Sequence, residues 1–142
     1  SSAASDVYKR QVNVEWAEKN FCASVDEQVP GAVVVTDKTL EGLKQAVREA
    51  VEFHVEGMLA DGDEVPAWLA EGNYDFEWVL GVSALLRGCG QFVSLAAIAR
   101  ASGINEQQLS HYANGLKRPR PAQRQRIVDG LHRIGQNLLS VV

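Results

Sequence analysis

Residues 94–115 read Ser94-Leu-Ala-Ala-Ile-Ala-Arg-Ala-Ser-Gly-Ile-Asn-Glu-Gln-Gln-Leu-Ser-His-Tyr-Ala-Asn-Gly115. This stretch predicts two short helices, over residues 95–102 and 106–114. Ser94 and Asn105 are suited to cap them, because serine and asparagine oxygens accept hydrogen bonds from the amides of a first helical turn. The stretch therefore indicates two helices joined by a very short connection.

The residues between and within these helices indicate how they cross. Gly103 suits a left-handed turn, and Ala99 is small where two helices must approach closely. We expect Ile104, Leu109 and Tyr112 to fill the space between the helices. This spacing is typical of a helix-turn-helix, whose second helix enters the DNA major groove.

The second helix and the segment after it carry polar and basic side chains. Gln can pair with adenine, and Ser can contact several base edges, whereas Lys and Arg bind phosphates. The alternative is a bundle of small helices with a solvated polar face. We favour DNA binding and predict ten interface residues: Ser94, Asn105, Glu106, Gln107, Gln108, Ser110, His111, Lys117, Arg118 and Arg120.

Two further helices are expected in the C-terminal part. Val82-Ser-Ala-Leu-Leu86 predicts a short helix that Ser83 caps and that Gly88 and Gly90 end. A last helix over about 122–139 should turn four apolar side chains inward: Ile127, Leu131, Ile134 and Leu138.

The N-terminal part shows strand patterns around one long helix. Alternation predicts strands over 12–16, 21–25 and 74–80, and the continuous apolar run 32–36 predicts a strand buried on both faces. Between them, Asp37 or Thr39 can cap a helix whose apolar positions run from Leu40 to Met58, and 63–73 is expected to be mainly a loop. The fold class is α+β: a β-β-β-α-β domain over residues 12–81, followed by an all-α domain over 82–142.

Charge divides the 142 residues in a similar way. Residues 1–91 contain 16 Asp and Glu against 7 Lys and Arg, whereas residues 92–142 contain 2 against 7. The acidic half and the basic half indicate two partners of opposite charge. Residues 1–11 are expected to be a non-native or disordered tail, although Tyr8 onward could lengthen the first strand.

The sequence does not favour an enzyme. Six carboxylates fall near turns, where acidic residues are common, so a metal-dependent nuclease is a minor alternative: Asp26, Glu27, Asp37, Asp61, Asp63 and Glu64. No glycine-rich phosphate loop is present, and Cys22 and Cys89 match no metal spacing, so we expect no cofactor and no metal. Without a membrane span or secretory signal, a cytoplasmic location is expected.

The chain resembles two known families. Residues 94–121 resemble the phage-repressor or Cro-type helix-turn-helix. The span from Val12 to Val142 resembles HicB-type antitoxins of type II toxin–antitoxin systems. Six stretches carry this second resemblance: Val12-Asn-Val-Glu-Trp16, Val29-Pro-Gly31, Glu52-Phe-His-Val-Glu-Gly-Met-Leu59, Gly103-Ile-Asn-Glu-Gln-Gln-Leu-Ser-His-Tyr112, Lys117-Arg-Pro-Arg-Pro-Ala122 and Gly130-Leu-His-Arg-Ile-Gly135.

The resemblance implies a partial ribonuclease-H-like N-terminal domain without catalysis. This domain would occlude the RNA site of a cognate, small and basic HicA-type toxin that cleaves mRNA. The C-terminal domain would repress its own operon by binding operator DNA as a homodimer or higher even oligomer. The alternative is a helix-turn-helix transcription regulator with an N-terminal ligand-sensing domain.

Overall fold

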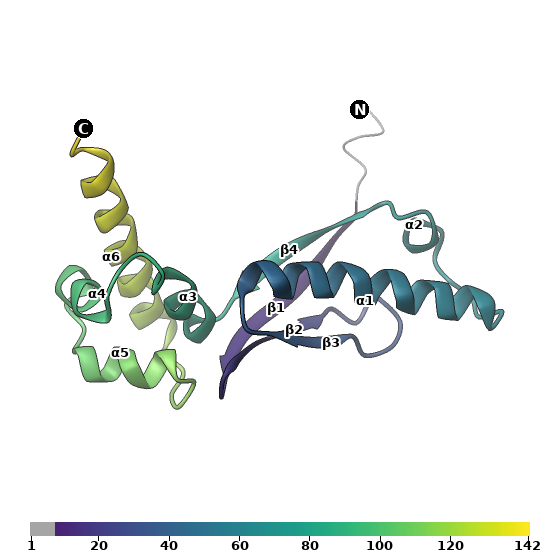
Figure 1. The fold of residues 1–142 in the computed structure, drawn as a ribbon, viewed down its shortest axis with the longest axis horizontal. Coiled ribbons are helices and arrows are strands. Elements are labelled where there is room, and N and C mark those ends of the chain that lie inside the picture. Colours follow the sequence, from purple (N-terminus) through teal and green to yellow (C-terminus); the bar gives the residue numbers. More distant parts are fainter. Residues whose placement is uncertain (1–7) are drawn as a thin grey trace. The chain divides into compact units, whose positions relative to one another are not determined.

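The computed structural model describes residues 8–142 (Figure 1). Over these residues the fold is mixed α/β, with a four-stranded sheet and six helices. The described chain divides into two compact units. Unit 1 comprises residues 8–14 and Lys19–Val79, and unit 2 comprises Glu15–Glu18 and Leu80–Val142. Among the described residues, no helix has both the length and the apolar character needed to span a membrane.

The first strand begins earlier than expected. Residues 1–7, most of the expected tail, lie outside the described residues. Residues 8–11 are not a tail, because they form the start of β1. The cause is that the inward alternation of Val12 and Val14 continues back to Arg10, which is only 9% exposed.

Unit 1 is built on a sheet of strand order β3-β2-β1-β4. β2 and β3 pair antiparallel, with Phe21 opposite Asp37. The Tyr8 amide donates to the Asn73 carbonyl at 3.3 Å, so β1 and β4 begin at the same end of the sheet. The elements in chain order are β1 (Tyr8–Ala17), β2 (Asn20–Val25), β3 (Val34–Asp37), α1 (Leu40–Ala60), α2 (Ala67–Ala70) and β4 (Tyr74–Leu80).

Helix α1 covers one face of this sheet and packs against β2 and β3 (Figure 1). Thr39 caps it, as expected, by accepting a hydrogen bond from the Gly42 amide at 3.0 Å. The core combines one stripe of α1 with alternate strand residues, and burying each of its Val, Leu and Phe side chains contributes about 1.5–3 kcal/mol. Its members include Val12, Val14, Phe21, Ala23, Leu43, Val47, Val51 and Val55.

One expectation for unit 1 is wrong. The strand expected over 32–36 is not buried on both faces, since β3 lies at the sheet edge and Val34 is 64% exposed. An edge strand covered by one helix has one open face, so its valines do not indicate full burial. Residues 63–73 are mainly a loop, as expected, and contain the single helical turn α2 over 67–70, with Leu69 buried.

Unit 2 contains α3 (Val82–Cys89), α4 (Leu95–Ser102), α5 (Glu106–Ala113) and α6 (Pro121–Leu139). Helices α4 and α6 approach so closely that a Cβ added to Gly130 would lie 3.0 Å from the Ser102 nitrogen. The four helices share one core, made of Val82, Leu86, Ile98, Ile104, Leu109, Tyr112, Ala113 and Ile127.

Three expectations for unit 2 need correction. Gly81, not Ser83, stands at the N-cap of α3, and the buried Ser83 hydroxyl bonds to the end of β1 instead. Helix α3 continues through Gly88 to Cys89, because its buried stripe outweighs the weak helix propensity of glycine. Leu138 is 63% exposed, since it lies near the end of α6, beyond the side chains that reach the core.

Candidate nucleic-acid interface

Capping bonds fix the turn between α4 and α5. The Ser94 hydroxyl accepts from the Ala97 amide at 3.1 Å, and the Asn105 side chain accepts from the Gln107 amide at 2.8 Å. Gly103 has a φ of +71°, the left-handed conformation that glycine adopts without a steric cost. Both expected caps and the turn glycine are therefore confirmed.

The buried side of α5 determines which residues point away from unit 2. Ile104 just before the helix, and Leu109 and Tyr112 within it, are each at most 5% exposed. With 3.6 residues per turn, Gln107 falls on the opposite side and Ser110 lies on the flank, about 100° from Leu109. Gln107 is exposed, so α5 presents its amide outward, whereas Ser110 is half-buried and its hydroxyl accepts a hydrogen bond from the Asn114 Nδ2 at 3.4 Å.

The predicted residues on α5 differ in how available their polar atoms are. Glu106 is exposed in the first turn, where its negative carboxylate interacts favourably with the positive end of the helix dipole. Gln108 is half-buried and donates to the Tyr112 hydroxyl at 2.8 Å, so one of its donors is already used. His111 is half-buried, and its Nδ1 is buried without a hydrogen-bond partner among the described residues.

The segment after α5 brings cations together. Lys117, Arg118 and Arg120 are all exposed, and they line a hollow of about 350 Å³ together with Gln108. A second hollow of about 310 Å³ adds Arg124, from the first turns of α6, to Lys117 and Arg118. Sequence reasoning missed Arg124, although its position four residues after Arg120 places both on one side of a helix start.

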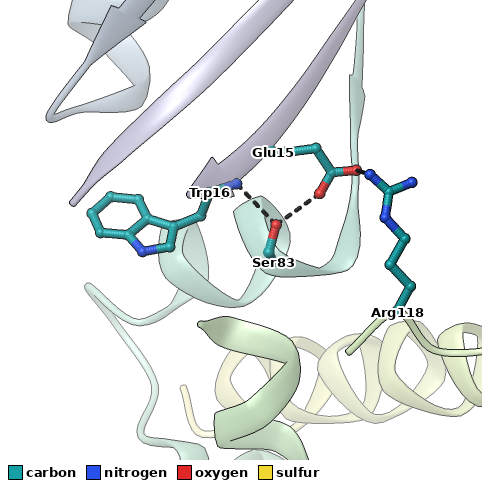
Figure 2. A network of polar contacts seen from close by, with 4 residues as sticks. All are labelled: Glu15, Trp16, Ser83 and Arg118. Carbon is teal, nitrogen blue, oxygen red and sulfur yellow. Dashed lines mark hydrogen bonds and ion pairs between the residues drawn. The ribbon is translucent and has the colours of Figure 1, made fainter. Parts of the chain in front are cut away.

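An ion pair holds one of these cations, as Figure 2 shows. The Arg118 guanidinium lies 3.8 Å from a Glu15 carboxylate oxygen, and the exposed fractions of the two side chains are 86% and 39%. Glu15 also accepts a hydrogen bond from the Ser83 hydroxyl at 2.7 Å, and this hydroxyl accepts from the Trp16 amide at 2.9 Å. Because such an exposed pair contributes at most about 1 kcal/mol, a phosphate can compete for Arg118.

Three other arginines have structural partners that the sequence did not reveal. The Arg87 Nε donates to the Ala113 carbonyl at the end of α5 at 3.0 Å. Arg126 donates to the Gly103 carbonyl at 3.0 Å, and Arg133 donates to the Ala101 carbonyl near the end of α4. The last carbonyls of a helix lack intrahelical partners, so these cations satisfy them and complement the helix dipole.

The candidate site consists of the outward side of α5 and the cations that line the two hollows, Lys117, Arg118, Arg120 and Arg124. Amide and hydroxyl groups can read base edges, while flanking guanidinium and ammonium groups can neutralise phosphates. Comparison with protein-family models, with curated proteins and with solved structures finds no match.

Proposed function

We propose that the chain is a DNA-binding repressor whose unit 2 acts as a helix-turn-helix of the phage-repressor or Cro type. The observation that carries this proposal is the orientation of α5. Its apolar side is buried, its polar side faces outward, and exposed Lys117, Arg118 and Arg120 follow it. Eight residues make a helix about 12 Å long, which is comparable to the width of the major groove.

The side chains have different roles in this proposal. Gln107 and Ser110 contact base edges, and His111 lies beside them on the same helix. Lys117, Arg118 and the neighbouring Arg120 bind phosphates and fix the register of the protein on the duplex. Ser94 and Asn105 act mainly through their caps, which hold α4 and α5 in place.

Unit 1 supports the second part of the proposal, a HicB-type antitoxin. It contains 13 Asp and Glu against 6 Lys and Arg, a net charge of −7, whereas unit 2 has a net charge of +4. An acidic surface attracts a basic, RNA-binding protein and repels nucleic acid. Unit 1 then neutralises a HicA-type toxin by occluding its RNA site, without catalysis of its own.

A groove in unit 1 favours a second candidate function. It has a volume of about 450 Å³ and lies along α1, α2 and β4, with Leu69 and Tyr74 among its lining residues. A cavity of this size can hold a small molecule. The alternative is therefore a transcription regulator whose unit 1 senses a ligand.

DNA binding is tested on the duplex upstream of the protein's own gene, over a series of salt concentrations. Arg118→Ala and Arg120→Ala should weaken binding to all sequences. Each should also reduce the slope of log affinity against log salt concentration by about one, because one phosphate contact is lost. Gln107→Ala should change the sequence preference instead. Lys38→Ala removes an exposed cation from unit 1 and is the matched control. If the unchanged protein does not bind the duplex, or if all four variants bind it with the same affinity and salt dependence, the proposal is contradicted.

Toxin binding is tested by coexpression with the open reading frame next to the gene. The antitoxin proposal predicts that a small basic protein copurifies and that its RNA cleavage stops. The same preparation tests assembly: a two-fold operator needs two copies of unit 2, so we expect a dimer or a higher even oligomer. If the protein is a monomer whose DNA binding changes only when a small molecule is added, the ligand-sensing transcription regulator is favoured.

A further inference from the structure

Five aromatic rings form a continuous ladder in unit 1. Trp68 of α2 contacts the Tyr8 ring, with the centroids 5.3 Å apart, and the Tyr74 ring, with the centroids 6.2 Å apart. Along β4, Tyr74 contacts Phe76 and Phe76 contacts Trp78, each with 5.5 Å between ring centroids. Tyr74, Phe76 and Trp78 are only half-buried, so an arriving partner can reach the ladder.

The chain places its own cations on both ends of this ladder. The Arg10 guanidinium carbon lies 4.9 Å from the centroid of Trp68. At the other end, the Lys44 Nζ lies 5.4 Å from the centroid of Trp78, and the Arg48 guanidinium carbon lies 5.9 Å from it. Aromatic faces attract cations at such distances. Among the described residues, no cation lies over the two middle rings, Tyr74 and Phe76.

These two middle rings line the groove of about 450 Å³ between α1 and β4. Three carboxylates line it as well: Glu52 and Glu56, one turn apart on α1, and Asp75 on β4. Within the described part of the chain, none of the three has an ion pair or a hydrogen bond. Because Arg48 is the one cation in the lining, the groove has a net charge of −2.

The negative potential extends to the aromatic floor. Burial raises the pKa of the Tyr74 hydroxyl above its ordinary value of 10.0, and the nearby Glu52 carboxylate raises this pKa further. Burial disfavours any ion, whereas the Glu52 carboxylate favours a cation beside the Tyr74 ring. The floor and the rim therefore favour the same kind of ligand.

We propose that this groove binds an arginine side chain of the basic partner protein, stacked on Tyr74 and Phe76 and paired with Glu52 and Glu56. Arginine fits better than lysine, because its planar guanidinium stacks on rings while its N–H groups pair with two carboxylates. The Arg10 guanidinium over Trp68 is an example within the same unit. The proposal extends the proposed antitoxin function, on which the identity of the partner depends.

The site is tested without the partner by NMR titration of the full chain with N-acetyl-arginine amide. We expect saturable shifts of the amide signals of Glu52, Glu56 and Tyr74 through Phe76. N-acetyl-citrulline amide has the same shape without the charge and should produce much smaller shifts. The proposal is overturned if both compounds act alike or if neither affects these signals.

Variants then test the groove against the basic protein encoded beside the gene. Glu52→Gln with Glu56→Gln should weaken this complex about three- to tenfold, as expected for two partly exposed charge pairs. Glu27→Gln with Glu49→Gln removes the same charge from exposed positions outside the groove and should change the affinity less than twofold. Phe76→Leu keeps an apolar side chain but loses the ring face, and should cost about two- to fivefold.

The two experiments separate the inference from the function. If the basic protein binds equally well to the groove variants and to the control variants, the groove proposal is wrong while the antitoxin function stands. If the basic protein does not bind at all but N-acetyl-arginine amide does, the antitoxin function fails and the arginine site stands.

Discussion

The close approach of α4 and α6 in unit 2 gives a prediction with a matched control. Gly130 and Gly135 both lie in α6. A Cβ at position 130 would lie 3.0–3.1 Å from the Ser102 nitrogen, Cα and Cβ, whereas a Cβ at position 135 meets no atom within 4 Å. Favourable carbon contacts require about 3.5–4.0 Å, so Gly130→Ala must push α6 and α4 apart by about half an ångström.

The magnitudes follow from two opposing effects. In a helix, Gly→Ala gains about 1 kcal/mol, so Gly135→Ala should stabilise the protein by roughly this amount. Overpacking costs about 1–3 kcal/mol, so Gly130→Ala should be neutral or destabilising by up to about 2 kcal/mol. Urea unfolding, followed through the amide signals of α4 and α6, measures both variants. Equal stabilisation by the two variants would refute the close packing of α4 on α6.

Three further predictions concern single groups. Glu15→Gln removes the carboxylate beside Arg118 and should increase DNA affinity about two- to fivefold at low salt, with little effect at high salt; anisotropy titrations measure both. Gly103→Val forces a β-branched residue to a φ of +71° and should destabilise unit 2 by about 1–3 kcal/mol in urea unfolding, whereas an unchanged midpoint would exclude the strained turn. Glu52→Gln should lower the raised pKa of Tyr74 in an NMR titration of its ring signals. Tyr74 ionises at a lower pH in the unfolded chain than in the folded one. Its contribution to the free energy of unfolding is therefore present below about pH 10 and is lost as the pH rises further.

The sequence predicts local structure in unit 2 well, because each signal there has a local cause. Ser94 and Asn105 cap the helices that follow them, and Gly103 adopts the left-handed turn. Ser83 looks like another cap but is buried, and its hydroxyl bonds to the distant Glu15. Local sequence cannot reveal such a partner, since it depends on how the chain folds back on itself.

Charge patterns predict the candidate site only in part. The basic balance of the C-terminal part counts Arg126 and Arg133 as DNA-binding charges, yet both donate to carbonyls at the end of α4 or in the turn after it. Composition does not separate a cation that closes a helix end from one that faces solvent. Strand alternation predicts that Tyr74 and Phe76 share one face of β4. It does not predict that carboxylates of α1 lie beside them, because that depends on how α1 packs against the sheet.

The central claim is that the outward side of α5 and the loop after it contact DNA. Titrating the isotope-labelled full chain with the duplex upstream of its own gene tests this claim directly. The proposal predicts that the largest amide shifts fall on Gln107, Ser110 and residues 117–120, and that they diminish as salt increases. Shifts confined to unit 1, or a spectrum that the duplex leaves unchanged at low salt, would contradict it.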